Sequence, residues 1–319
     1  MDRRSFLRNA SLAVITSPLN LQACNSDVEL PIIDTHQHLW DLNRFPLTWV
    51  KSPLNKSFLM EDYMQAIEKQ NVVKAIYMEV SVPPELRREE AAWALSLCED
   101  PGNPTVASVI RADPTDSDFE PYMRSFEGNR YLKGIRYIFS NEKEHLLPHV
   151  IENIRLLGKM GLSVDLNLST EKLHLGGQLL DKCPDTRFIL NHCGNADPAA
   201  FFPREKEMPR KPKHDRDKWF RDMELLAQRT NIVCKVSGIV DNVSDYPLTA
   251  ADLAPIVNHC LNVFGPDRVL FAGDWPVCLV NMSLYRWIAM LKEVVSNCSN
   301  IDQRKLFHDN AYKFYGLND

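Results

Sequence analysis

Two histidines, His36 and His38, lie one residue apart directly after an apolar run in the segment IIDTHQHLWD, residues 32–41. In a β-strand, side chains at positions i and i+2 point to the same face. If residues 31–36 form a buried strand, both imidazoles leave its end on one side and converge on one point. That arrangement suits a metal ion or a reacting oxygen atom. A pair with this spacing also occurs by chance. Whether it marks a functional site therefore depends on the other polar residues of the chain.

Further polar side chains stand near the ends of later apolar runs. A buried polar or charged group is costly unless it is paired or bound, so this many at the ends of successive runs indicate a site. Some of them have a second explanation, because Glu79, Arg136 and Lys235 could each be an ion-pair partner, and a structural role is favoured for one carboxylate, Asp165. The full set is Glu79, Arg136, Asp165, Asn167, His192, Lys235 and Asp274.

Three histidines and one carboxylate are a plausible set of ligands for a divalent cation. We therefore expect His36, His38, His192 and Asp274 to form the centre of the site, with His192 and Asp274 as the catalytic candidates. A cation would polarise a carbonyl and acidify water. The same groups could instead bind a carbonyl oxygen and activate water without a metal. Either way, the predicted chemistry is the attack of water on a carbonyl.

Eight apolar, β-branched runs of strand length could position these side chains. They alternate with segments whose apolar residues have helical spacing, at 60–70, 85–100, 147–160, 218–230 and 253–265. Such alternation predicts parallel βαβ units, and eight of them favour a closed (β/α)₈ barrel of the TIM type. No phosphate-binding glycine loop follows any run, which disfavours a nucleotide-binding open sheet. The eight runs span 31–36, 73–81, 105–113, 132–139, 162–168, 187–194, 231–239 and 268–275.

One connection, residues 195–218, is unusually long and is rich in proline and basic residues. Long connections in compact domains are usually lids, binding loops or disordered segments. A run of charged residues is most often solvated surface, but this one follows His192. We therefore leave two interpretations equally open, a lid or binding loop and solvated surface.

The composition is that of an ordinary globular α/β protein. The chain has 319 residues, 45% of them hydrophobic, and a formal net charge of −5. Nothing in this balance indicates nucleic acid as a partner. The eight cysteines are scattered without a CxxC pair, so neither a zinc ribbon nor a disulfide scaffold is indicated.

Residues 1–24 resemble a twin-arginine export signal, in which Arg3 and Arg4 begin RRSFLR and a mildly apolar stretch follows. Its end, Leu21 to Cys24, also resembles a lipobox, whose cysteine would be lipidated and would attach the protein to a membrane. Simple cleavage remains the alternative. We expect an exported bacterial protein, periplasmic or anchored as a lipoprotein, with a catalytic domain at 30–319.

Five segments in order, IIDTHQHLWD, LKGIRYIF, FILNHCGNAD, IVCKVSGI and FGPDRVLFAGDWPV, resemble the signature segments of the amidohydrolase-2 family. Its sugar-lactonase branch contains L-fuconolactonase and L-rhamnonolactonase. The resemblance implies a (β/α)₈ barrel that opens lactone rings. It assigns His36 and His38 to the first-strand pair, His192 to the sixth strand, and Asp274 to the base that handles the proton.

The chain departs from the family pattern at three places. Asn191 replaces an acid, and Gly273 stands where a serine is usual. Binuclear members of the superfamily use a bridging lysine, but Lys133 begins its strand and Lys235 comes after His192. We therefore expect one divalent cation, with zinc favoured, or none.

The sequence therefore predicts a carboxylic-ester hydrolase. Its expected substrate is a small-molecule lactone, most simply a sugar-derived aldonolactone. The residues expected to bind the substrate could otherwise fill the barrel rim or form ion pairs. A decarboxylase of aromatic or unsaturated acids on the same barrel and a non-catalytic surface sugar-binding protein remain alternatives. The oligomeric state is not predicted. The expected substrate-binding residues are Glu79, Arg136, Trp40, Asn167, Lys235 and Trp275, with Trp49 and Tyr137 as further aromatic candidates.

Overall fold

The computed structural model describes residues 29–139, 143–203, 210–243 and 246–318. Eight parallel strands are hydrogen-bonded in the order in which they occur along the chain. The predicted export signal and Cys24 lie outside the described residues. The strands are β1 (Ile32–Gln37), β2 (Val72–Met78), β3 (Thr105–Arg111), β4 (Leu132–Ile138), β5 (Ser163–Asn167), β6 (Arg187–Leu190), β7 (Ile232–Val236) and β8 (Val269–Phe271).

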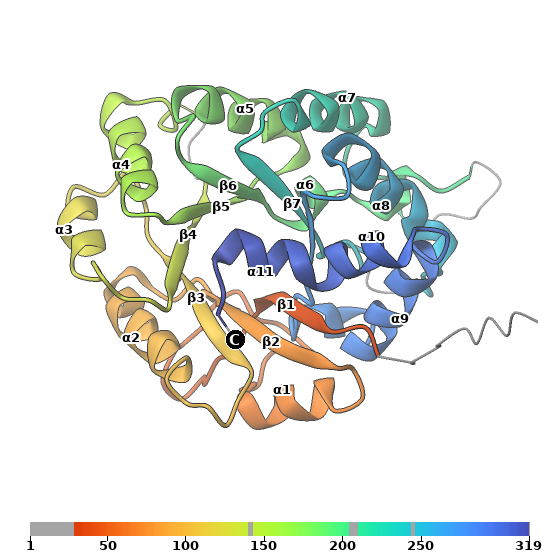
Figure 1. The fold of residues 1–319 in the computed structure, drawn as a ribbon, viewed down its shortest axis with the longest axis horizontal. Coiled ribbons are helices and arrows are strands. Elements are labelled where there is room, and N and C mark those ends of the chain that lie inside the picture. Colours follow the sequence, from red (N-terminus) through yellow and green to blue (C-terminus); the bar gives the residue numbers. More distant parts are fainter. Residues whose placement is uncertain (1–28, 140–142, 204–209, 244–245, 319) are drawn as a thin grey trace, which may run out of the picture.

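The last strand returns to the first at one end of the sheet. Gln37 pairs in parallel with Trp275, and the backbone N–H of His38 donates to the carbonyl oxygen of Trp275 at 2.8 Å. The predicted (β/α)₈ barrel is therefore confirmed, since this junction joins the segment after β8 to the end of β1. Figure 1 shows the strands inside the surrounding helices.

Helices surround the barrel on its outer side (Figure 1). All five segments predicted to be helical overlap a helix, and the structure adds helices such as α5, in which two adjacent glycines weaken the helical signal. The helices are α1 (Met60–Ile67), α2 (Arg87–Leu97), α3 (Phe119–Arg124), α4 (Pro148–Lys159), α5 (Leu173–Lys182), α6 (His192–Asn195), α7 (Arg216–Ala227), α8 (Ala250–Phe264), α9 (Leu284–Val294), α10 (Asn300–Arg304) and α11 (Asn310–Tyr315).

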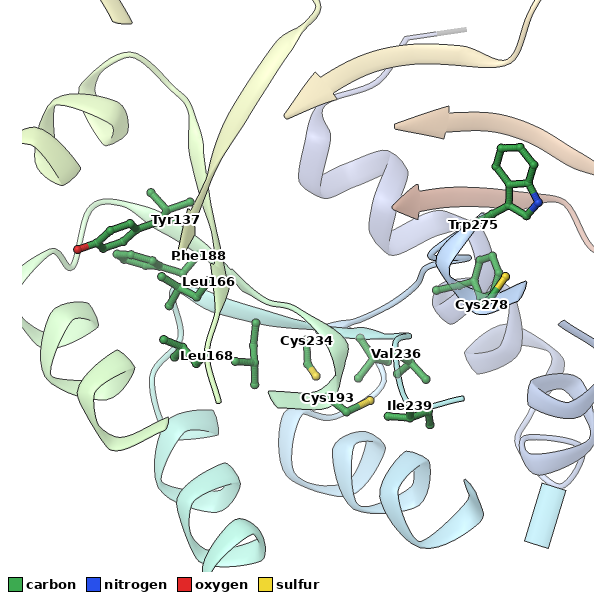
Figure 2. Close-up of a cluster of buried hydrophobic side chains, with 14 of the residues drawn as sticks. Tyr137, Leu166, Leu168, Phe188, Cys193, Cys234, Val236, Ile239, Trp275 and Cys278 are labelled. Carbon is green, nitrogen blue, oxygen red and sulfur yellow. The ribbon is translucent and has the colours of Figure 1, made fainter. Parts of the chain in front are cut away.

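Two apolar layers stabilise the barrel, one inside it and one between the strands and the helices. The outer layer includes Leu166, Phe188 and Cys234, which lie between the strands and the surrounding helices (Figure 2). The inner layer includes Ile33, Ile189 and Leu270. Alternating side chains of a strand therefore serve different layers, as the near-continuous hydrophobicity of the strands predicts.

The helix α11 crosses the end of the barrel at which the strands begin. Tyr315 and Leu317 pack with the inner layer, and Arg187, the first residue of β6, donates to the carbonyl oxygen of Phe314. Because this end is covered, the opposite end, where the strands finish, remains available for a site. Within the described part of the chain, no helix is both long enough and apolar enough to cross a bilayer.

Several strands end earlier than predicted, and at β6 and β8 the difference matters for the site. β6 ends at Leu190 and β8 at Phe271, whereas the sequence pattern extends them to 194 and 275. His192 and Asp274 have φ angles of 56° and 52°, in the left-handed region that strands do not use. Both residues therefore lie just beyond their strands, where the left-handed backbone re-aims their side chains, and His192 is the first residue of α6.

Candidate active site

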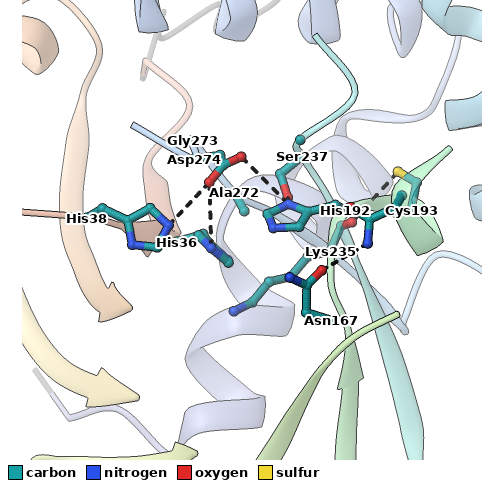
Figure 3. A network of polar contacts seen from close by, with 12 residues as sticks. His36, His38, Asn167, His192, Cys193, Lys235, Ser237, Ala272, Gly273 and Asp274 are labelled. Atoms are coloured by element: carbon teal, nitrogen blue, oxygen red, sulfur yellow. Dashed lines mark hydrogen bonds and ion pairs between the residues drawn. The ribbon is translucent and has the colours of Figure 1, made fainter. Parts of the chain in front are cut away.

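Four of the predicted residues come together at the end of the barrel where the strands finish. Asp274 Oδ1 lies 3.6 Å from His36 Nε2 and 3.4 Å from His38 Nε2. Asp274 Oδ2 lies 3.7 Å from His192 Nδ1. All four side chains are buried, and the three imidazoles surround the carboxylate (Figure 3).

Local backbone geometry explains this convergence. His36 in β1 and His38 just after it lie on one face, with ring centroids 4.8 Å apart, as their spacing predicts. The turn after β7 makes room for His192, because a Cβ atom at Gly238 would lie 2.3 Å from His192 Nδ1. Glycine is therefore required at position 238.

The departure from the family pattern at Gly273 has a similar explanation. The buried Asp34 accepts hydrogen bonds from the backbone N–H of Gly273 at 2.7 Å and from the hydroxyl of Tyr63 at 2.9 Å. A Cβ atom at Gly273 would lie 2.4 Å from Asp34 Oδ2. Asp34 thus occupies the space of a side chain at 273 and fixes the backbone directly before Asp274.

The pKa shifts favour neutral imidazoles at His36 and His192 and an ionised carboxylate at Asp274. Burial, together with nearby His192 and Lys235, lowers the pKa of His36 well below its ordinary value. Burial lowers the pKa of His192 to about 4. Burial opposes ionisation of Asp274, but His192 and His38 outweigh it and hold its pKa below the ordinary value. These are the charge states in which such side chains bind a metal.

The residues present fit a single divalent cation. One ligand atom from each of His36, His192 and Asp274 lies within 4.8 Å of the others. Neither ring nitrogen of His36 has a hydrogen-bond partner among the described residues, although the ring is fully buried. His38 is oriented by the carbonyl oxygen of Met78, 2.9 Å from its Nδ1, so that Nε2 faces Asp274. Such a backbone contact is typical of histidines that bind metals.

A cavity of about 270 Å³ opens beside these side chains. Two of the predicted substrate-binding residues, Arg136 and Asn167, line it. In contrast, Glu79, Trp40, Lys235 and Trp275 are not among its described lining residues. The lining residues are His38, Trp49, Val80, Ser81, Arg136, Ile138, Asn167, His192, Asn195, Gly238, Asp241, Asp274 and Val277.

Glu79 is fully buried and positions two residues that line the cavity, Arg136 and Ser81. Its Oε1 lies 3.4 Å from Arg136 NH1, and its Oε2 accepts a hydrogen bond from the backbone N–H of Ser81 at 2.7 Å. The ion-pair alternative therefore describes Glu79 in this structure, where it orients Arg136 toward the cavity.

Lys235 is also committed to an ion pair. Its Nζ lies 2.6 Å from Asp165 Oδ1, and both side chains are fully buried inside the barrel. Substrate contact is thus not the role that this geometry supports. The same pairing leaves Lys235 unsuited to bridge two metals.

Two of the three candidate tryptophans, Trp40 and Trp275, fill the rim. Trp40 is fully buried against Phe58, and its Nε1 donates to the carbonyl oxygen of Lys56 at 2.7 Å. Trp275 is 2% exposed and packs on Phe58 and Tyr63. By contrast, Trp49 lines the cavity, and its indole Nε1 donates to Val80 O at 2.8 Å.

Asp241 is a functional candidate that the sequence did not reveal. It lines the cavity, and its Oδ1 is buried without a hydrogen-bond partner among the described residues. Burial and the nearby Asp274 raise the pKa of Asp241 to about 8. Its carboxyl group follows the end of β7 by five residues, and in the sequence it looks like one of several polar loop residues.

Comparison with known proteins places this geometry in a family. The family model described as amidohydrolase matches residues 33–317. An L-fucono-1,5-lactonase of Burkholderia multivorans is 26% identical over 298 residues, covering 89% of this chain and 96% of that protein. An uncharacterized Sinorhizobium fredii protein, y4mH, is 26% identical over 311 residues, covering 90% of this chain and 99% of its own.

The fold has counterparts among solved structures. The crystal structure of an amidohydrolase from Burkholderia multivorans with bound zinc superposes with a TM-score of 0.77 at 21% identity, covering 90% of this chain and 100% of the other. The family match spans nearly all of the barrel and includes every residue of the site. The protein therefore belongs to the amidohydrolase family.

Proposed function

We propose that this amidohydrolase opens a small sugar-derived lactone by adding water to its ester carbonyl. The observation that carries the proposal is a carboxyl group, Asp274, held among three imidazoles at the wall of a cavity of about 270 Å³. The L-fucono-1,5-lactonase relative supports it, because that protein is named for the same type of reaction.

In the proposed reaction Asp274 acts as the general base. It takes a proton from water as the water oxygen bonds to the lactone carbonyl carbon, and it returns the proton to the ring oxygen as the carbon–oxygen bond of the ring breaks. The product is an open hydroxy acid. A base must be ionised at working pH, and the lowered pKa of Asp274 meets this need.

Other residues of the site would orient the substrate. Arg136, fixed by Glu79, directs its guanidinium toward the cavity, where it suits an oxygen of the substrate. Asn167 adds an amide on the same side. Asp241 offers a second carboxyl group whose unpartnered oxygen suits a substrate hydroxyl. The exposed indole of Trp49 can lie against a sugar ring.

We propose a single divalent cation, zinc, held by His36, His192 and Asp274 with His38 beside them. When bound, it would polarise the ester carbonyl and favour the loss of a proton from water. Elemental analysis should give about one cation per chain in such a ligand set. His36→Ala should release the cation, whereas His174→Ala, at an exposed position on α5, should retain it. Two tightly held cations per chain would contradict the proposal.

A screen of aldonolactones with a pH indicator tests the function, since each opened ring releases one acidic proton. Turnover of a sugar lactone with no release of carbon dioxide is the expected result. Release of carbon dioxide from an aromatic or unsaturated acid would instead support the decarboxylase alternative. Sugar binding without any turnover would support the non-catalytic alternative.

A further inference from the structure

We propose that two described parts of the long connection after β6, residues 195–197 and 210–214, help to build a second subsite. It binds a further hydroxyl-bearing unit of the substrate beyond the lactone ring that is opened. The inference rests on the proposed lactone hydrolysis and names its substrate class, an aldonolactone that carries a second sugar unit.

A second cavity, of about 490 Å³, adjoins the catalytic one. Ile138, Asn167 and Asn195 line both. Ligand pockets commonly measure roughly 300–1,000 Å³, so the catalytic cavity of about 270 Å³ alone suits only a small ring. A substrate that spans the shared wall would fill the combined space.

The shared wall is held in place by hydrogen bonds. Asn195 Nδ2 donates to Asn167 Oδ1 at 2.9 Å and to the carbonyl oxygen of Leu168 at 2.6 Å. These bonds tie the first residues of the connection to the end of β5. A ligand therefore meets a fixed edge between the two cavities.

A buried carboxylate, Asp197, fixes the segment that carries Lys213 and His214. Its two oxygens accept hydrogen bonds from both terminal nitrogens of Arg210, at 2.7 and 2.8 Å, and from the backbone N–H of Lys213 at 2.8 Å. The backbone N–H of Asp197 donates to His214 Nε2 at 2.9 Å. Burial opposes its ionisation, but Arg210 outweighs that and lowers the pKa of Asp197. Because charge-assisted hydrogen bonds are strong, residues 210–214 are held against 195–197.

This clamp places Lys213 and His214 in the second cavity. Lys213 Nζ donates to Asn242 Oδ1 at 2.9 Å, which fixes the ammonium group near the end of the β7 turn. The hydrogen bonds of Asp197 therefore hold an ammonium group and an imidazole at the lining of the second cavity.

The chemistry of the second cavity matches a sugar unit. Its lining combines donors, such as Lys213, with acceptors, such as Glu171, and with amide and hydroxyl groups that do both. Sugar hydroxyls both donate and accept hydrogen bonds. The ring of Phe139 provides a limited apolar face. A long apolar tail would leave most of these polar groups without partners, which is costly.

The test compares glucono-1,5-lactone with the lactones of cellobionic, maltobionic and lactobionic acids, which carry a second hexose. The parent protein should open at least one of the disaccharide lactones with a higher kcat/KM than glucono-1,5-lactone. Lys213→Ala removes the ammonium and keeps the backbone bond to Asp197, and it should lower kcat/KM for the preferred disaccharide lactone about ten-fold, the scale of one hydrogen bond to a charged group. The same variant should leave glucono-1,5-lactone within about two-fold.

Two further variants keep the test decisive. Ser169→Trp places bulk in the second cavity and should reduce turnover of the disaccharide lactone alone. Lys211→Ala, at an exposed position that lines neither cavity, is the matched control and should change neither substrate. The proposal is overturned if the parent shows no preference for any disaccharide lactone, or if Lys213→Ala and Ser169→Trp leave the preference unchanged.

Calorimetric binding of the open acids separates this proposal from the proposed reaction. If no lactone is opened, the reaction proposal fails. Tighter binding of lactobionate, cellobionate or maltobionate than of gluconate, with that difference lost in Lys213→Ala, would still support the subsite. Equal binding of all four acids to the parent protein would overturn it.

Discussion

Replacing Lys235 with methionine tests the role that the structure gives to the polar pair inside the barrel. Lys235 Nζ and Asp165 Oδ1 are 2.6 Å apart, and both side chains are fully buried. Asp165 Oδ2 has no hydrogen-bond partner among the described residues. Burial lowers the pKa of Lys235 and raises the pKa of Asp165, whereas the opposite charge of each partner counteracts the shift of the other. Each charged form is therefore stabilised by its partner. Lys235→Met retains the length of the side chain and leaves an unpaired carboxyl group in the core.

Removing one partner of a buried ion pair costs about 3–5 kcal/mol in the free energy of unfolding. The expected loss is near the lower end, because Asp165, whose pKa is already raised, can take up a proton. For a domain of this size, a loss of that order lowers Tm by about 5–8 °C. The assay is urea and thermal unfolding of the parent, Lys235→Met, and the double variant Asp165→Asn/Lys235→Met.

The double variant should recover part of the stability, since it removes the unpaired charge together with its partner. Catalysis should survive in it, because neither residue lines the cavity. A Lys235→Met protein within about 1 kcal/mol of the parent would refute the reasoning. Parent-like stability combined with a specific rise in KM would indicate that Lys235 binds the substrate, as the sequence analysis expected.

Two other predictions concern pH and export. Burial and Glu79 raise the pKa of Glu90 to about 8, so its contribution to stability is fully present below its unfolded-state pKa of about 4.5 and is lost as the pH rises through about 8. The free energy of unfolding of the parent, relative to Glu90→Gln, should therefore fall between pH 5 and pH 9 in urea titrations, and an unchanged difference would show that Glu90 is already ionised. For residues 1–24, proposed as an export signal, replacing Arg3 and Arg4 with lysine should trap the precursor in the cytoplasm, and continued export would remove the twin-arginine assignment. A Cys24→Ala variant that stays membrane-bound would exclude lipidation as the anchor.

The strand-and-helix alternation was sufficient to predict the barrel, because period-two and period-3.6 patterns are local properties of the chain. The convergence of His36 and His38 was predictable for the same reason, since extended backbone at the end of a strand points residues i and i+2 to one face. The site at the carboxyl ends of the strands then follows from the fold. Dependence on local signals also explains why helix α5 was not predicted. Its glycines weaken the helical signal, while packing against the barrel stabilises the helix.

Side-chain partners were beyond the reach of the sequence. Lys235 looked like a substrate ligand because its distance to Asp165, 70 positions away in the chain, depends on the registers of β5, β6 and β7. Trp275 looked like a stacking platform because nothing local shows that it packs against Phe58 and Tyr63.

Turn geometry was equally hidden. The left-handed backbone of His192 and Asp274 shortens both strands and aims the two side chains at each other. Asp241 lines the cavity from the turn after β7. The direction of a side chain in a turn cannot be predicted from the periodicity of the sequence, so this residue was missed.

The kcat of a folded Asp274→Asn protein tests the central claim most directly. The amide preserves the shape and can keep hydrogen bonds to the neighbouring imidazoles, but it cannot accept the proton of the attacking water. Turnover of the lactone identified in the screen should fall about 10²–10⁴-fold, the scale of a positioned acid–base group, while unfolding curves match those of the parent. The open acid should still bind, because Arg136 and Asn167 are unchanged. Turnover within a few-fold of the parent rate would contradict the assignment of Asp274 as the base.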